Sequence, residues 1–230
     1  MIFPEKLVHG TLIKRYKRFL ADVRLDDGTE IVAHCTNSGS MKSCLETGAE
    51  VYLTPVNDPK RKTKFTWEMI KINNNWVGIN TGNPNRIAFE TISAGMIKEL
   101  EGYSTVKREV KFGDSRFDIF AENENEKCFV EVKNVTLKEG NYALFPDAVT
   151  IRGRKHLKTL IEVKQEGIRA VMLYIIQRID VDIFAPAKEI DPLYAIALKQ
   201  AVLAGVEVIA VQVKVTPFRI DLLRKLPVEL

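Results

Sequence analysis

The sequence lacks the cysteine pattern of a metal-binding or disulfide-stapled domain. Cys35, Cys44 and Cys128 are odd in number and show no C-x-x-C spacing, which argues against a zinc site and a disulfide framework. No apolar run reaches membrane-spanning length, and Met1–Lys6 contains no secretory signal. We therefore expect a soluble, cytoplasmic protein with reduced thiols and no membrane partner.

The sequence also lacks internal repeats, low-complexity segments and a strong charge of one sign. Its net charge of +4 favours a polyanionic partner only weakly, because many ordinary enzymes share such a balance. No segment has the pattern of a helix-turn-helix recognition helix, so base-specific readout is not expected. With 230 residues, 46% of them hydrophobic, the chain can bury one large core or two small ones.

The first part of the chain predicts a small all-β domain. Short strand-like segments follow one another up to Asn80, and the turn Asp26–Gly28 joins two of them as a hairpin. The segments are 11–13, 19–25, 29–33, 50–54, 65–70 and 76–79. This density of short strands suits a closed barrel, so we expect an OB-like, nucleic-acid-binding barrel in residues 1–82.

After the turn-rich joint 81–85, the pattern changes to that of an α/β domain. The expected helices are 86–92 with Asn85 as N-cap, 151–166 ending at Gly167, and a helix that begins at Asp191–Pro192 and ends at Gly205. The apolar run 170–176 predicts a strand buried on both faces, and 206–211 a parallel neighbour. We therefore expect a mixed sheet with helices in residues 83–230.

In this second part, a predicted hairpin places Asp118 on one strand opposite Glu131 and Lys133 on the other. Two strand-like segments, 115–120 and 130–133, flank the polar turn Asn123–Lys127. In the second of them, valines alternate with Glu131 and Lys133, so both charged side chains point to one face. Hydrolysis of a phosphodiester needs a divalent ion and a cation near the phosphoryl group. We expect Asp118 and Glu131 to bind Mg²⁺ or Mn²⁺, with Lys133 beside the phosphate.

The spacing D-x(12)-E-x-K, with Glu90 on the preceding helix as a further acid, is similar to the motif of the PD-(D/E)XK nuclease superfamily. Phe117 stands where that motif has a proline. Asp114 competes with Asp118, but its Gly-Asp-Ser context predicts a turn. The structural alternative is an ordinary salt bridge between Glu131 and Lys133 on a solvated strand.

Cations gather in three places that we expect to contact nucleic acid. Arg152, Lys155 and His156 share one face of the helix after the hairpin. Lys14, Arg15, Tyr16, Lys17 and Arg18 interleave cations with an aromatic ring, and Arg61 and Lys62 lie in an expected loop. Such mixtures can follow a phosphate backbone and stack on bases, although each cluster could also be a solvated surface.

Five longer stretches resemble the sugar fermentation stimulation protein A family over essentially the whole chain. They are Leu12–Val23, His34–Met41, Gly102–Lys111, Val130–Leu137 and Phe145–Leu157. The resemblance implies an N-terminal OB-fold domain, a C-terminal PD-(D/E)XK nuclease-like domain and DNA binding with little sequence preference. It also implies a link to the transcriptional regulation of sugar (maltose) metabolism, and it places the nuclease-like core on Glu90, Asp118, Glu131 and Lys133.

Three hypotheses about function follow. The first is a DNA-binding protein with a Mg²⁺-dependent nuclease site, acting as an endonuclease or an exonuclease. The second is a regulator that binds DNA with little sequence preference and performs no chemistry. The third replaces DNA with RNA as the bound polymer.

Overall fold

The first part of the chain forms a closed barrel. The computed structural model describes all 230 residues. Its first strands are β1 (Val8–Tyr16), β2 (Leu20–Leu25), β3 (Glu30–His34), β4 (Glu50–Pro55), β5 (Phe65–Ile72) and β6 (Asn75–Gly78). They form a sheet in the order β3-β2-β1-β4-β5-β6, and His34 of β3 also pairs with Thr66 of β5, which closes the sheet. The expected OB-like barrel is confirmed.

The barrel closes around a compact apolar core. Alternate residues of its strands point inward, and Leu12, Val23 and Val51 are almost completely buried there. Trp67 is fully buried in the same core, and its indole N–H donates to the Met69 carbonyl at 2.9 Å. Its role is therefore in packing.

The second part is built on a mixed sheet with the order β15-β14-β12-β9-β8-β7. These strands are β7 (Thr105–Phe112), β8 (Ser115–Glu122), β9 (Lys127–Val135), β12 (Arg169–Ile176), β14 (Glu207–Val215) and β15 (Ile220–Lys225). The β8–β9 hairpin is antiparallel, whereas β9, β12 and β14 run parallel to one another. A small sheet of β10 (Leu137–Glu139), β11 (Tyr142–Phe145) and β13 (Ile183–Pro186) lies beside it. The expected α/β domain with a mixed sheet is confirmed.

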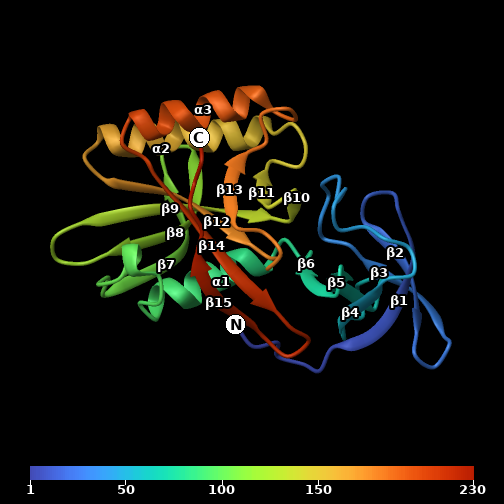
Figure 1. Ribbon diagram of the computed structural model, residues 1–230. Coiled ribbons are helices and arrows are strands. Elements are labelled where there is room, and N and C mark those ends of the chain that lie inside the picture. The colour runs from blue at the N-terminus through green and yellow to red at the C-terminus, as the bar shows by residue number, and fades with distance from the viewer.

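Helices cover both faces of this sheet (Figure 1). They are α1 (Asn83–Ser93), α2 (Ile151–Gln165) and α3 (Pro192–Leu203), with a short 3₁₀ turn at Lys98–Leu100. Helix α1 lies on one face, and α2 and α3 lie side by side on the other (Figure 1). None of these helices combines the length and apolar character needed to cross a bilayer.

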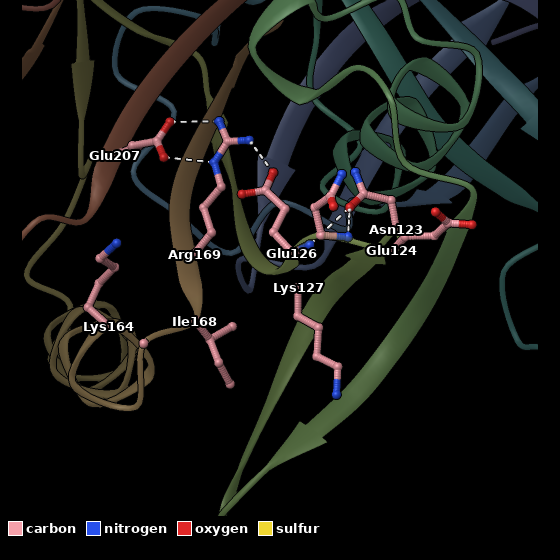
Figure 2. Close-up of a pocket in the computed structure, with 10 residues that line it drawn as sticks. Asn123, Glu124, Glu126, Lys127, Lys164, Ile168, Arg169 and Glu207 are labelled. Atoms are coloured by element: carbon pink, nitrogen blue, oxygen red, sulfur yellow. Dashed lines mark hydrogen bonds and ion pairs between the residues drawn. The ribbon is translucent and has the colours of Figure 1, made fainter.

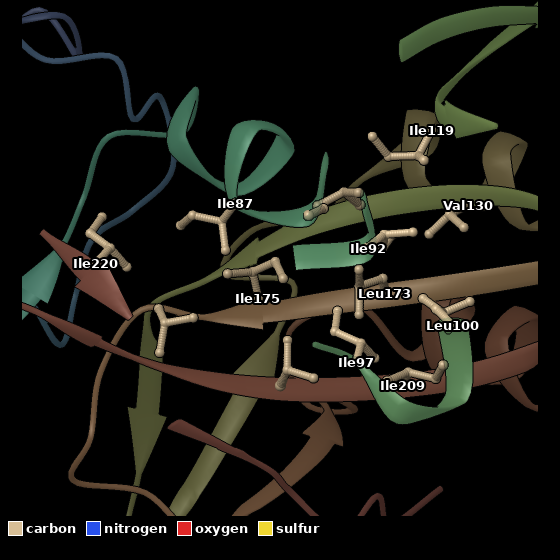
Figure 3. Packing of buried hydrophobic residues seen from close by; sticks show 14 of the residues in the cluster. Ile87, Ile92, Ile97, Leu100, Ile119, Val130, Leu173, Ile175, Ile209 and Ile220 are labelled. Atoms are coloured by element: carbon tan, nitrogen blue, oxygen red, sulfur yellow. The ribbon is translucent and has the colours of Figure 1, made fainter. Parts of the chain in front are cut away.

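Strand β12 contributes to two apolar cores at once. Leu173 and Ile175 point into the core beneath α1, together with Ile87 and Val130 (Figure 3). The intervening residues, such as Met172, point into the core beneath α2 and α3. Double-sided burial explains why this segment is continuously apolar in the sequence.

The helix ends agree with the sequence pattern in two cases and correct it in one. Thr150 caps α2 and Asp191 caps α3, each by accepting a backbone N–H at 3.0 Å. The expected cap at Asn85 is wrong, because α1 already begins at Asn83. Pro84 favours this earlier start, since proline is well tolerated in the first helical turn. Asn85 therefore lies inside the first turn and its side chain is free for another contact.

A buried arginine joins the two parts. Arg178, just after β12, has a side chain that is 1% exposed and pairs with Asp180 at 2.8 and 2.9 Å. It also donates to the Thr136 carbonyl at 2.7 Å and to Ser43 Oγ, on a barrel loop, at 3.1 Å. The neighbouring Gln177 carbonyl accepts the Gly78 N–H at 2.9 Å. These contacts fix the barrel against the second domain.

We propose residues 1–82 and 83–230 as the two domains, with one exception. The N-terminal amine of Met1 donates to the Ile220 carbonyl at 2.8 Å, and Phe3 packs in the core beneath α1. The first residues therefore lie against the second domain before the chain enters the barrel.

We expect Arg178→Ala to destabilise the protein by about 3–5 kcal/mol, because it leaves Asp180, the Thr136 carbonyl and Ser43 Oγ without their buried cation. The matched control is Arg24→Ala, which removes an exposed pair with Glu30 and should cost less than about 1 kcal/mol. Urea denaturation followed by fluorescence measures both. Equal losses in the two variants would contradict the role given to Arg178.

Candidate functional site

Asp118 lies where β8 separates from β9. The ladder between these strands runs from Glu122 beside Lys127 to Ile119 beside Val130 and stops there. Beyond that point the Val132 N–H donates to Asp118 Oδ2 at 2.8 Å, so a side chain replaces the backbone acceptor. This opening between two strands turns the Asp118 carboxylate toward β9.

Glu131 is the most buried acid in this opening. Its side chain is 2% exposed, and its Oε1 accepts hydrogen bonds from Lys133 Nζ and from His156 Nδ1 of α2. Both Glu131 and Lys133 therefore lie on the α2 side of the sheet, as the alternation in β9 predicts. Glu131 Oε2 is buried and has no hydrogen-bond partner. A buried carboxylate oxygen without a donor is costly unless a cation or another donor reaches it.

His156 is held in one orientation. Its Nε2 accepts a hydrogen bond from Arg152 Nε at 3.3 Å, so the neutral ring carries its proton on Nδ1 and donates it to Glu131. Arg152 and His156 are four residues apart on α2, which places them on one helical face. The structure thus joins two residues of the expected basic face to the acid of the hairpin.

The pKa values of the two carboxylates of the site shift in opposite directions. Burial, followed by the charge of Glu131, raises the pKa of Asp118, against the opposing effect of the Val132 N–H. Burial also raises the pKa of Glu131, but the hydrogen bond from His156 and the charge of Lys133 outweigh it and hold that pKa below its usual value. Two neighbouring acids that repel each other, one with an unpaired oxygen, fit a divalent cation with oxygen ligands.

The structure does not bring Glu90 to this cluster. Its carboxylate pairs with the Met1 amine at 3.3 Å and with Arg86 at 2.7 Å. Asn85 lies beside the site instead, and its Nδ2 donates to Asp118 Oδ1 at 2.6 Å. Residues five apart on a helix are separated by about 140° around the axis, so Asn85 and Glu90 cannot both face Asp118. No group of three Asp, Glu, His or Cys side chains in the structure could hold a metal ion.

Some of the cations in and next to the β1–β2 turn make contacts with other residues of the barrel. Arg15 donates through Nη2 to the carbonyls of Asn37 at 2.8 Å and Gly39 at 3.1 Å, so it braces a loop of the barrel. Lys14 pairs with Asp22 at 3.5 Å and remains exposed. A hydrogen bond donated to the Asp22 carboxylate raises the pKa of Tyr16. Lys17 is exposed.

The remaining expected contacts with nucleic acid lie on separate elements. Arg61 donates to Thr66 Oγ1, on β5, at 3.2 Å, whereas Lys62 is exposed. Lys155 is exposed on α2.

A hollow lies at the end of the sheet where β9, β12 and β14 begin (Figure 2). Its centre is Arg169, which binds Glu207 through two nitrogens at 2.7 and 2.8 Å and also contacts Glu126 at 3.2 Å and Tyr103 at 2.9 Å. The positive charge of this arginine is neutralised by protein groups. We therefore assign this hollow a structural role.

Comparison with known proteins gives the family. Residues 13–79 match the model of the SfsA N-terminal OB domain, and residues 82–219 match that of the sugar fermentation stimulation protein RE domain. The chain belongs to the sugar fermentation stimulation protein family. The expected family resemblance is therefore confirmed, and the two matched segments agree with an OB domain followed by a second, α/β domain.

Individual relatives cover nearly all of the chain. A sugar fermentation stimulation protein homolog of Geobacter sulfurreducens is 53% identical, over 99% of this chain and 98% of that protein. A homolog of Paramagnetospirillum magneticum is 52% identical, over 96% and 95%. The solved structure of Pyrococcus furiosus SfsA in complex with Ca²⁺ is 31% identical, with a TM-score of 0.90 over 100% of this chain and 98% of that one.

We expect Asn85→Asp to destabilise the metal-free protein at pH 8 by about 1–3 kcal/mol, because a third carboxylate would replace the donor to Asp118. Acidification should reduce this loss as the facing carboxyls become protonated. The control Glu90→Gln neutralises a carboxylate that is 37% exposed, so its cost should stay below about 1 kcal/mol. Urea denaturation in EDTA at two pH values measures both variants. A loss for Asn85→Asp no larger than for Glu90→Gln would contradict the proximity of Asn85 to the acids.

Proposed function

We propose that this protein binds DNA with little sequence preference and cleaves phosphodiester bonds with a divalent metal ion, Mg²⁺ or Mn²⁺. The single observation that carries the proposal is the pair of a half-buried Asp118 and a buried Glu131 beside Lys133, with Glu131 Oε2 unpaired. The Ca²⁺ complex of the Pyrococcus furiosus relative supports a divalent ion in this family.

Each residue of the site has a separate role in this proposal. Asp118 and Glu131 would hold the metal ion, which when bound would activate a water molecule and neutralise charge on the phosphate. Lys133 would contact a phosphate oxygen and stabilise the charge that develops there. Asn85 and His156 would orient the two acids through their hydrogen bonds to Asp118 and Glu131.

The binding surface would contact the phosphate backbone and not the base edges. Lys155 and Lys62 are exposed cations on the two domains, and the sequence has no helix-turn-helix pattern that would supply a recognition helix. Backbone contacts carry no sequence information but release counterions, so affinity should fall steeply with salt.

A non-catalytic DNA-binding regulator is the alternative, and one observation favours it. Only two acids meet at the site, because Glu90 pairs with Met1 and Arg86. In this alternative, Lys133 and His156 act as permanent partners of Glu131, and the protein regulates genes of sugar (maltose) use by occupying DNA in the cytoplasm.

Competition between DNA and RNA of the same length tests which polymer the protein prefers.

We expect the purified protein to cleave labelled DNA with Mg²⁺ or Mn²⁺, and Glu131→Gln to lower the rate at least about a hundredfold. Lys133→Ala should cause a loss of similar size, because the charge beside the phosphate disappears. Glu90→Gln serves as the matched acidic control and should retain most of the activity. Gel analysis of the products measures all rates. Product that persists in Glu131→Gln, or no product with either metal, would leave only the regulator.

Metal binding itself gives a test that does not depend on cleavage. We expect Mn²⁺ at a hundredfold excess over its dissociation constant to stabilise the wild type by about 2.7 kcal/mol, which corresponds to roughly 5–10 °C in Tm for a chain of this size. Asp118→Asn and Glu131→Gln should abolish most of this shift, whereas Glu90→Gln should retain it. Scanning fluorimetry in EDTA and in Mn²⁺ measures the shifts. Equal shifts in all four proteins would place the metal elsewhere.

A further inference from the structure

A cleft of about 470 Å³ lies between the barrel and the second domain, and it reaches the candidate site. Arg18 and the loop Thr36–Gly39 line it from the barrel, Lys133 and Asn134 from β9, and Arg152 from α2. We propose that this cleft binds one strand of DNA and guides its backbone to Lys133. This inference rests on the proposed function, to which it adds the path and the form of the substrate.

Three cations from three separate elements face this cleft. Arg18 lies in the β1–β2 turn, Lys133 on β9 and Arg152 in the first turn of α2. Asp147 is the one acid among the lining residues, and its Oδ2 is turned toward the barrel loop, where it accepts the Met41 N–H at 3.4 Å. The lining therefore favours an anionic chain that passes from the barrel to the site.

The backbone holds Arg18 in place. Lys17 and Arg18 both have positive φ, 48° and 65°, which is uncommon for residues with a side chain. Arg18 donates through Nε and Nη2 to the Ser38 carbonyl, at 3.1 and 2.8 Å. Its Nη1 makes no hydrogen bond within the protein. The guanidinium is thus oriented by the loop that lines the cleft and keeps one nitrogen available for a phosphate.

The walls of the cleft are fixed relative to each other. Arg15 braces the Asn37 and Gly39 carbonyls from the barrel side. On the other side, a Cβ atom at Gly39 would lie only 2.1 Å from Asp147 Oδ2, so the loop and the 145–150 segment are closely packed. The cleft is therefore a preformed site, which lowers the entropic cost of binding.

The dimensions and lining of the cleft favour a single strand. A space of this volume holds a ligand of the size of a small drug, which suits a short stretch of one strand and not a duplex. Val149 lines the cleft with 65% of its surface exposed, and Phe145, whose ring packs against Tyr174 and Tyr194, also lines it. These apolar groups can contact base faces without reading their edges, which agrees with low sequence preference.

Fluorescence anisotropy can test whether a DNA strand binds in the cleft. The probe is labelled oligothymidine, and EDTA is present so that nothing is cleaved. We expect Arg18→Gln and Arg152→Gln each to weaken binding at least about tenfold, because each removes a charge-assisted contact with a phosphate. Each should also reduce the slope of log affinity against log salt by about 0.7. Arg24→Gln, an exposed barrel arginine outside the cleft, is the matched control and should change neither quantity.

A second test blocks the cleft without removing a charge. Ala148 is exposed and lines the cleft, and the three native cysteines are buried. Ala148→Cys coupled to a bulky maleimide should lose oligothymidine binding, while the unlabelled variant binds normally. Gln200→Cys, on the exposed face of α3, carries the same label as the control and should bind as the wild type does.

The outcomes separate this inference from the proposed function. Unchanged salt slopes in Arg18→Gln and Arg152→Gln, or normal binding by labelled Ala148→Cys, would overturn the cleft path even if the protein cleaves DNA through Glu131. Equal affinity for a hairpin duplex through the same residues would overturn the preference for a single strand. Cleft-dependent binding without any cleavage would support the path and refute the nuclease.

Discussion

The burial of β12 between two apolar cores is the constraint on which the site depends. Because β12 must present apolar residues to both faces, its parallel pairing with β9 has one register, in which Met172 lies beside Glu131 and Tyr174 beside Lys133. A shift of one residue would move both charged side chains into the core beneath α1. The packing of β12 therefore decides that Glu131 and Lys133 meet α2 and its His156.

The sequence patterns predicted the fold where a segment is buried on one or both faces. The barrel strands, the β8–β9 hairpin and the parallel pair β12 and β14 all follow from alternation or from continuous apolar runs. The strands that escaped prediction are β7, β10, β11, β13 and β15. Several of these lie at sheet edges or have only three or four residues, so exposed charges or short length remove the periodic signal.

Local sequence patterns could predict the part of the candidate site that lies on the β8–β9 hairpin, but not the rest. Asp118, Glu131 and Lys133 are brought together by local strand pairing, and His156 joins them because α2 crosses β9. Asn85 was missed because its distance from Asp118 depends on where α1 begins and how it packs. Proline at position 84 was the available signal, since it moves the helix start and turns Asn85 inward. Glu90, chosen from its helical context, faces the chain terminus instead.

The junction of the two domains and the candidate site share one structural basis. β9 continues from Lys133 to Asn134, whose side chain accepts a hydrogen bond from Gln177 at 2.8 Å, and Gln177 is bonded in turn to the barrel through Gly78. A displacement of the barrel would therefore also shift β9 and with it Lys133. Since Arg178 prevents such a displacement, Arg18 and Lys133 keep a fixed separation, as two contacts on one polymer backbone require.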